Sequence, residues 1–163
     1  LSNDNTRADI RGEDGNDVLY GYARNSVLNG GAGNDMLYGG AFSTDYTSGT
    51  GADTLFAGAG GDTFNYRPLD SNSTQGRDTI YNFDVVRDLI RVNNSDMGAK
   101  DFIIVAVAES DHVVIGTSDN SFILDLRGFD VNKVQDLEER MVVNADSTFE
   151  VKLLAAGSTV EFI

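Results

Sequence analysis

Apolar side chains recur at intervals of nine residues through the first two-fifths of the chain. The positions are Ile10, Leu19, Leu28, Leu37, Tyr46, Leu55 and Phe64. A period of nine is a repeat signature and not the period of a single helix or strand. We expect each unit to be a six-residue turn followed by a three-residue strand whose middle side chain points inward. One unit cannot bury that side chain alone, so the units must stack.

Four of the units also share a polar pattern, G-G-x-G-x-D-x-U-x, in which U is apolar. They begin at Gly12, Gly30, Ser48 and Ala57, and their sixth residues are Asp17, Asp35, Asp53 and Asp62. The other units, residues 3–11, 21–29 and 39–47, keep the phase but carry Ala8, Ser26 and Thr44 at the sixth position. Residues 3–66 therefore hold seven units in register, with aspartate-bearing and aspartate-free units alternating until the last pair.

The polar turns carry ligands for a hard cation. Glycines supply the positive φ angles and the close backbone approach that other residues resist. Each turn leaves backbone carbonyls and one carboxylate exposed, and two turns stacked together would form an oxygen cage that suits Ca²⁺. An isolated Gly-Asn-Asp triplet is normally a solvated turn. Four such turns in phase, each with an apolar residue two places after the aspartate, indicate calcium binding instead.

These repeats resemble the RTX (repeats-in-toxin) family. The resemblance implies an all-β, right-handed parallel β-roll in which Ca²⁺ lies between turns two units apart on the same side. One ion would then lie between the turns of Asp17 and Asp35, and a second between those of Asp35 and Asp53. The opposite flank would be largely free of metal, except near Asp62, whose partner would come from residues after the roll. The candidate ligand positions in the repeats are Gly12, Asp14, Gly15, Asp17, Gly30, Gly31, Gly33, Asp35, Gly49, Gly51, Asp53 and Asp62.

The segment after the repeats begins with a polar loop, residues 67–77. Residues 78–92 read as two strand fragments around a bend, and their D-x-I-x-x-F-x(4)-D-x-I pattern resembles the RTX cap of serralysin-type metalloproteases and alginate epimerases. That resemblance implies a further calcium at the junction of roll and cap, with Asp78, Asp84 and Asp88 as candidate ligands and two or three ions in all. These residues could equally be surface acids that flank strands.

The remainder reads as a small, mostly antiparallel cap continuous with the roll, over residues 67–163. Residues 99–108 form an apolar strand, and residues 113–115 and 122–126 a hairpin. A helix is expected over residues 131–140, with Asp130 at its start. Two more strands are expected over residues 149–154 and 159–163.

The amino-acid composition limits which classes of binding partner the chain can have. The 163 residues include 12 Lys and Arg against 26 Asp and Glu, giving a net charge of −14. This charge argues against nucleic acid and anionic membrane surfaces and suits a cation binder. There is no cysteine and no apolar run of about 18 residues that would span a membrane. The chain begins at Leu1 without a signal peptide, reads as a piece of a larger protein, and is expected to be a monomer.

Motifs for catalysis are missing. The single His112 has no HExxH context, and no G-x-S-x-G elbow or phosphate-binding glycine loop is present. We therefore expect a non-catalytic module that folds when Ca²⁺ binds outside the cell. The RTX resemblance implies a bacterial protein exported by type I secretion machinery, and the ending Glu161-Phe162-Ile163 is similar to a protease-type secretion signal, although a final structural strand fits equally well. The parent would be a secreted enzyme: a mannuronan C5-epimerase, a metalloprotease or a lipase.

Two alternatives remain open. The chain could be the alginate-binding module of a mannuronan C5-epimerase, or the terminal module of an RTX adhesin. For alginate, Arg7, Arg11 and Arg24 could form a positive stripe on the flank opposite the calcium ions, which Arg67 and Arg77 might extend. The alternative for these arginines is that they are solvated side chains that offset nearby acids. Four tyrosines could offer stacking faces for sugars or pack between units: Tyr20, Tyr22, Tyr38 and Tyr46.

Overall fold

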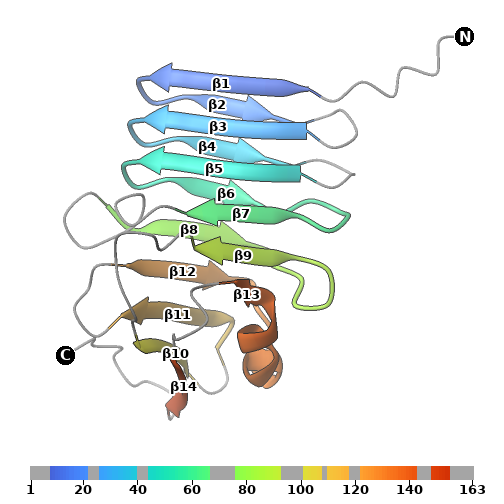
Figure 1. Cartoon of the computed structure of the whole chain (residues 1–163), viewed down its shortest axis with the longest axis vertical. Helices are drawn as coiled ribbons and strands as arrows, with labels where there is room; N and C mark the ends of the chain where they lie inside the picture. The colour runs from blue at the N-terminus through green and yellow to red at the C-terminus, as the bar shows by residue number, and fades with distance from the viewer. Residues whose placement is uncertain are drawn as a thin grey trace, which may run out of the picture.

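The computed structural model describes residues 8–21, 26–39, 44–66, 76–92, 101–107, 110–117, 122–142 and 148–154. Two sheets run along the long axis of the molecule and enclose one core (Figure 1). The first sheet has the strand order β1-β3-β5-β7-β9-β13, and the second has the order β14-β10-β11-β12-β8-β6-β4-β2. The strands of the first sheet are β1 (Asp9–Asp14), β3 (Ser26–Ala32), β5 (Thr44–Thr50), β7 (Thr63–Tyr66), β9 (Leu89–Val92) and β13 (Met141–Val142). Those of the second are β2 (Val18–Tyr20), β4 (Met36–Tyr38), β6 (Thr54–Phe56), β8 (Asp78–Tyr81), β10 (Asp101–Val107), β11 (His112–Thr117), β12 (Ile123–Arg127) and β14 (Thr148–Leu154).

The repeat units stack, as the nine-residue period predicts, and they stack in parallel, as the RTX resemblance implies. The chain passes alternately from one sheet to the other, so each strand pairs with the strand two units away. Leu19 pairs with Leu37, and Leu37 with Leu55, in one sheet. Leu28 pairs with Tyr46 in the other. These inward side chains are buried in a single core, because successive residues of a strand alternate between its two faces. The all-β parallel roll is confirmed.

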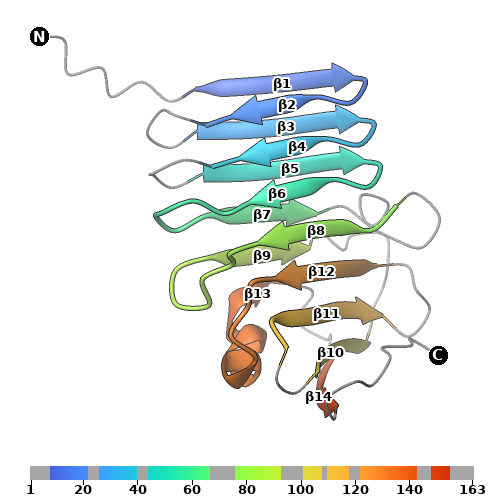
Figure 2. The same cartoon turned by 180° about the vertical axis from the view of Figure 1, so that it is seen from behind.

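The parallel roll continues beyond residue 66, where the nine-residue pattern stops. β8 extends the second sheet beside β6, with Ile80 next to Leu55, and β9 extends the first sheet beside β7, with Ile90 next to Phe64. The two strand fragments expected over residues 78–92 are therefore present, but they lie in different sheets and form another turn of the coil. β12 then pairs with β8, and β13 with β9, both in parallel. Figure 2 shows this continuation from behind.

The cap closes one end of the roll with mixed pairing. β10, β11 and β12 are antiparallel neighbours, which confirms the expected hairpin, whereas β14 runs parallel to β10. The helix expected over residues 131–140 is a 3₁₀ helix, η1 (Val131–Arg140). Asp130 begins it as expected, because its Oδ1 accepts a 3.1 Å hydrogen bond from the amide of Asn132. The strand expected over residues 159–163, with Glu161-Phe162-Ile163, lies outside the described residues, as does most of the expected loop at residues 67–77.

No helix among the described residues is both long enough and apolar enough to cross a membrane. The inward side chains of the roll lie in columns, and aromatic residues join this core to that of the cap. Tyr66 packs edge-on against Phe122, and Phe122 against Phe102, so the last strands of the roll and the hairpin share one interior. Phe56 is not part of this core, because it lies on the outer face of the second sheet between Tyr38 and Tyr81.

Candidate functional site

The turns of the roll lie in two columns. We call first flank the column formed by residues 12–17, 30–35, 48–53 and 76–78, which lead from the first sheet into the second. We call second flank the column that leads back, which includes residues 57–62 and 82–88. Glycine is required where turns of the first flank touch. Gly33 has a φ of 129°, and a Cβ there would overlap the carbonyl oxygen of Gly15. Gly31, with a φ of 107°, is pressed in the same way against the carbonyl of Glu13.

The sixth-position aspartates of the first flank form a hydrogen-bonded column. The amide of Asp17 donates to Oδ1 of Asp35 at 2.9 Å, and the amide of Asp35 donates to Oδ1 of Asp53 at 2.7 Å. Asp53 continues the pattern, because its amide donates to Oδ1 of Asp78 at 3.0 Å. Each carboxylate is thus fixed by the backbone of the preceding turn. The structure therefore brings four of the predicted ligands into one line, including Asp78 from beyond the repeats.

The second carboxylate oxygen, Oδ2, lacks a hydrogen-bond donor in two of these aspartates. Oδ2 of Asp17 and Oδ2 of Asp35 are buried and accept no hydrogen bond. Burial raises the pKa of Asp35, against the opposing effect of the hydrogen bond from Asp17. A buried carboxylate oxygen without a donor is unfavourable unless a cation compensates it. Asp17 and Asp35 thus each present one buried carboxylate oxygen that no described protein donor compensates.

Backbone carbonyls share the space with these carboxylate oxygens. A Cβ on Gly12 would meet both Oδ2 of Asp17 and the carbonyl oxygen of Gly30. A Cβ on Gly30 would meet both Oδ2 of Asp35 and the carbonyl oxygen of Ser48. Oxygens from two successive turns therefore converge beside each of these glycines, and mixed carboxylate and carbonyl oxygens are the ligands that Ca²⁺ takes. Among the described residues, no three or more Asp, Glu, His or Cys side chains are arranged so that they alone could hold a metal ion, so a cation here would depend on carbonyls.

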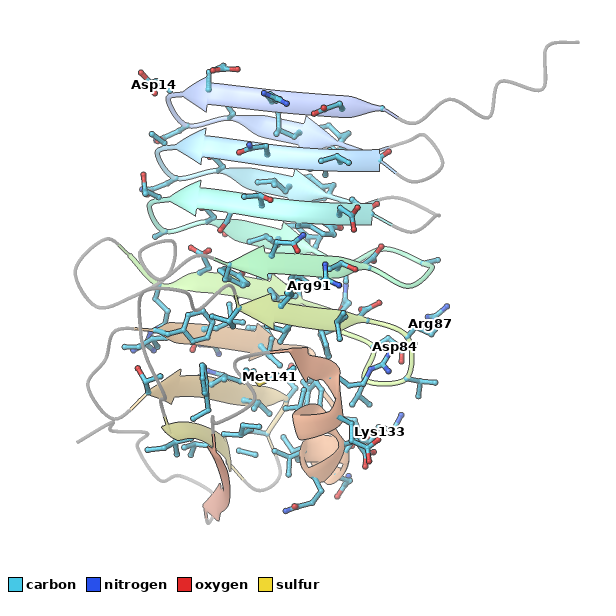
Figure 3. All side chains as sticks on the ribbon, viewed as in Figure 1. Asp14, Asp84, Arg87, Arg91, Lys133 and Met141 are labelled. Carbon is cyan, nitrogen blue, oxygen red and sulfur yellow. The ribbon has the colours of Figure 1, made fainter. Side chains whose placement is uncertain are left out.

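Other predicted ligand positions have different surroundings. Gly15, Gly49 and Gly51 all have positive φ angles and serve the shape of the turns. Ser48 stands where other units have their first glycine, and its buried Oγ has no hydrogen-bond partner. Asp14 is exposed at the end of β1 (Figure 3). Its side chain lies outside the line of sixth-position carboxylates.

The second flank is saturated by protein donors. Asp62 accepts hydrogen bonds on Oδ1 from the amide of Thr44 at 2.7 Å and on Oδ2 from the amide of Gly58 at 3.1 Å. Asp88 accepts from the amide of Asp62 at 3.0 Å and from the amide of Asp84 at 2.8 Å, again with one bond on each oxygen. Burial, together with the charge of Asp88, raises the pKa of Asp62 to about 6. The structure thus places Asp62 beside a partner from beyond the repeats, but their carboxylate oxygens already have donors.

A positive side chain also reaches the second flank. Nε of Arg140, at the end of η1, donates to the carbonyl of Asp88 at 2.8 Å, and its Nη2 donates to the carbonyl of Val86 at 3.0 Å. This guanidinium therefore brings a positive charge to backbone carbonyls of the second flank. Sequence reasoning missed Arg140 because it is 52 residues from Asp88 and belongs to no motif.

Asp84 behaves as a turn residue. Its Oδ1 accepts a 2.9 Å hydrogen bond from the amide of Val86, and its Oδ2 lies 2.7 Å from the guanidinium of Arg87. The bond from Val86, followed by the interactions with Arg87, lowers the pKa of Asp84. Figure 3 shows Asp84 and Arg87 on the turn between β8 and β9, away from the first flank. Its surroundings are those of a partly exposed acid at a turn.

The arginines do not form one stripe across the described residues. Arg11 lies on β1 of the first sheet, 3.4 Å from the carboxylate of Asp9. Arg77 precedes β8 of the second sheet, 3.5 Å from the carboxylate of Asp125. Arg7, Arg24 and Arg67 lie outside the described residues, as does Tyr22. Tyr46 is buried between units, stacked on Phe64 at a centroid distance of 4.6 Å, so it offers no face to a sugar.

A signal for the extra turn of the roll was present in the sequence. Gly76-Arg77-Asp78-Thr79-Ile80 repeats the spacing of Gly51-Ala52-Asp53-Thr54-Leu55. Gly76 has a φ of 131°, and a Cβ there would meet the backbone of Gly51, so it takes the same place in the stack as the glycines before it. An insertion between residues 66 and 76 breaks the phase and hides this unit from a strict nine-residue count.

Comparison with known proteins agrees with this geometry. The RTX calcium-binding nonapeptide repeat, in four copies, matches residues 11–43 and 47–66. The chain is similar in structure to the AlgE6R2 subunit of the mannuronan C5-epimerase from Azotobacter vinelandii, with 23% sequence identity and a TM-score of 0.57, covering 98% of this chain and 99% of that one. The AlgE6R3 subunit of the same epimerase is 26% identical, with a TM-score of 0.46, covering 95% of this chain and 84% of that one. No curated protein matches the chain as a relative. Residues 11–43 and 47–66 therefore consist of RTX calcium-binding nonapeptide repeats, and the fold of the chain is an all-β roll similar to that of the AlgE6R2 subunit.

Proposed function

We propose that this chain is a non-catalytic part of a larger secreted bacterial enzyme, which folds when Ca²⁺ binds the first flank outside the cell. In this role it supports the export, the folding and the substrate holding of its parent. The observation that carries the proposal is the pair of buried Oδ2 atoms of Asp17 and Asp35, which lie beside backbone carbonyls and accept no hydrogen bond. Nothing else in the described turns fits these oxygens as well as a divalent cation does.

The ligands of the bound ions would come from successive turns. One ion would take Asp17 and Asp35 with the carbonyl of Gly30, and another would take Asp35 and Asp53 with the carbonyl of Ser48. Asp78 extends the same column, so a third ion between Asp53 and Asp78 is compatible with this arrangement. We assign no ion to Asp62, Asp84 and Asp88, because their carboxylates are held by amides and by Arg87.

Calcium then controls folding through linkage. Without a cation, stacked carboxylates repel one another, and the glycine-rich turns lose much conformational entropy on ordering. An ion that binds only the folded state adds RT ln(1 + [L]/Kd) to the free energy of unfolding. Extracellular calcium modules bind at roughly 10⁻⁴ to 10⁻³ M. The module would therefore stay loose at low intracellular calcium and become rigid after export.

Calcium removal tests this proposal directly. We expect the chain in chelator to lose most of its far-ultraviolet β-sheet circular dichroism and the dispersion of its amide NMR signals, and to regain both when Ca²⁺ is added to a few millimolar. Magnesium at the same concentration serves as the control, because it demands a smaller octahedral site and gives up its waters reluctantly. A spectrum that is equally folded in chelator and in Ca²⁺ would refute coupled folding.

A second candidate function is the binding of an anionic polysaccharide such as alginate. It is favoured by the similarity in fold to a subunit of a mannuronan C5-epimerase and by a surface that joins tyrosine rings to arginines on the second sheet. The two functions are compatible, because a calcium-stabilised roll would provide the rigid support for such a surface. The position of the surface is argued next.

A further inference from the structure

One continuous row of side chains crosses the outer face of the second sheet. Cross-strand register places its members side by side in the order Tyr20, Tyr38, Phe56, Tyr81, Arg127 and His112. The residues before them on β2, β4, β6, β8 and β12 are buried in the core, so the row itself points outward. It therefore runs perpendicular to the strands, along the length of the roll.

The first four members form a stack of aromatic rings. Centroids are 4.8 Å apart between Tyr20 and Tyr38, 4.5 Å between Tyr38 and Phe56, and 5.0 Å between Phe56 and Tyr81, with interplanar angles of 10°, 1° and 12°. Each inner ring covers the faces of its neighbours, so the stack presents mainly ring edges on the outer face of the sheet. Tyr20 stands at the end of the stack and is 44% exposed. An amphipathic ridge of this kind suits sugars, which combine C–H faces with hydroxyl groups.

The other end of the row carries excess positive charge. Asp125 is the shared carboxylate, and its side chain is only 9% exposed. Arg77 lies 3.5 Å from it, Arg127 3.6 Å and His112 3.3 Å. The arginine side chains are 47% and 41% exposed, so both can reach a ligand while Asp125 orients them. Two guanidinium groups around one carboxylate leave a net positive site on a protein of net charge −14.

We propose that this row binds a linear acidic polysaccharide, with sugar rings along the tyrosine stack and a uronate carboxylate at Arg127 and Arg77. The proposal deepens the second candidate function and rests on it. A guanidinium presents paired donors that match a carboxylate, which explains why the positive end is built from arginine. The net negative charge elsewhere opposes polymers of high charge density such as nucleic acids. A uronate chain fits better, because apolar sugar faces alternate with its charges.

The arginine on the opposite sheet is less suited to this role. Both donors of Arg11 lie 3.4 Å from the carboxylate of Asp9, and Glu13 lies close enough to act on Arg11 through its charge. Here two acids face one guanidinium, the reverse of the ratio at Asp125. Arg11 is therefore a matched control, since it is also an exposed arginine on an outer sheet face.

The test is an NMR titration of the calcium-loaded chain with mannuronate oligomers of defined length. We expect amide shifts along β4, β6, β8 and β12. Arg127→Gln should weaken binding about tenfold, the scale of one lost charge-assisted hydrogen bond, whereas Arg11→Gln should leave the affinity unchanged. Arg127→Lys keeps the positive charge but not the paired donors of the guanidinium, so its affinity should lie between those of the other two variants. Tyr20→Ala provides a second test that leaves Asp125 undisturbed, and it should weaken binding severalfold.

The outcomes distinguish polysaccharide binding itself from the position of the binding surface. Binding that survives Arg127→Gln and Tyr20→Ala but is lost in Arg11→Gln would overturn this surface and leave polysaccharide binding in place. No shifts in the wild-type chain at millimolar oligomer would overturn polysaccharide binding itself. Equal affinity for a neutral glucan oligomer would overturn the role of Arg77 and Arg127. The amide spectrum of each variant in Ca²⁺ shows directly that it is folded.

Discussion

At the residue scale, the two flanks differ in how their carboxylates are satisfied. Asp35 receives one amide on Oδ1 and none on Oδ2, whereas Asp62 receives an amide on each oxygen. The same residue type thus keeps a buried oxygen without a donor in one column and has a donor for each oxygen in the other. Arg140 adds the contrast in charge, because its guanidinium donates to backbone carbonyls of the second flank.

Asp35 is the residue whose loss should affect calcium binding most. Its turn would contribute to both ions of the first flank, so Asp35→Ala should weaken calcium binding by roughly tenfold or more, the scale of a lost charged interaction. Asp17→Ala should cost less, Asp53→Ala should cost less when only the two ions bind and no third lies between Asp53 and Asp78, and Asp35→Asn keeps the acceptor for the Asp17 amide while removing the charge. Calcium titrations followed by isothermal calorimetry measure all four.

Ser26→Ala is the control for that series. Ser26 stands at the sixth position of an aspartate-free unit and faces the second flank, so its replacement should leave the calcium affinity unchanged. A large loss of affinity in Ser26→Ala would refute the assignment of the ions to one flank. Equal losses in Asp17→Ala, Asp35→Ala and Asp53→Ala would instead refute the shared turn.

At the scale of the elements, the glycine turns limit how closely the units stack. Gly15 and Gly33 have nearly the same φ, 131° and 129°, so alanine strains the backbone equally at both positions. They differ in space: a Cβ on Gly15 comes no closer than 4.0 Å to a neighbour, whereas a Cβ on Gly33 overlaps the carbonyl of Gly15. The pair separates backbone strain from steric overlap.

Gly33→Ala should therefore destabilise the calcium-loaded roll more than Gly15→Ala does. The strain common to both is about 1–2 kcal/mol, and the overlap adds about 1–3 kcal/mol for Gly33→Ala alone. Denaturant unfolding in saturating Ca²⁺ measures the difference. If both variants lose the same stability, contact between successive turns is not what requires glycine at Gly33.

Some of the structural elements could be predicted from the sequence and others could not. The nine-residue period predicts stacked units and Asp130 predicts the start of η1, because these features depend on local spacing, whereas the parallel roll was implied by the RTX resemblance. The further turn of the roll through Ile80 and Ile90 was less accessible, because an insertion separates Gly76 from the repeats. Arg140 and the cluster around Asp125 could not be predicted, because tertiary packing alone brings together residues distant in sequence.

At the scale of the whole molecule, the roll presents two chemically different surfaces, the turns of the first flank and the outer face of the second sheet. The turns of the first flank hold the buried Oδ2 atoms of Asp17 and Asp35, which accept no hydrogen bond, and the outer face of the second sheet holds an aromatic row that ends in arginines. Calcium would rigidify the turns of the first flank and thereby fix the spacing of the side chains in the aromatic row. The cap shares the core of the roll through Tyr66 and Phe122, so folding of the roll and of the cap should be cooperative.

The most direct test of the account replaces Ca²⁺ with a paramagnetic lanthanide such as Tb³⁺ and records the amide NMR spectrum. Lanthanides take the same hard oxygen ligands, and their paramagnetism broadens signals from nearby nuclei. We predict that the amides of Asp17, Gly33 and Asp35 broaden first, while those of Asp62 and Asp88 stay sharp at the same occupancy. Broadening that begins at Asp62 and Asp88, or equally on both flanks, would contradict the assignment of calcium to the first flank.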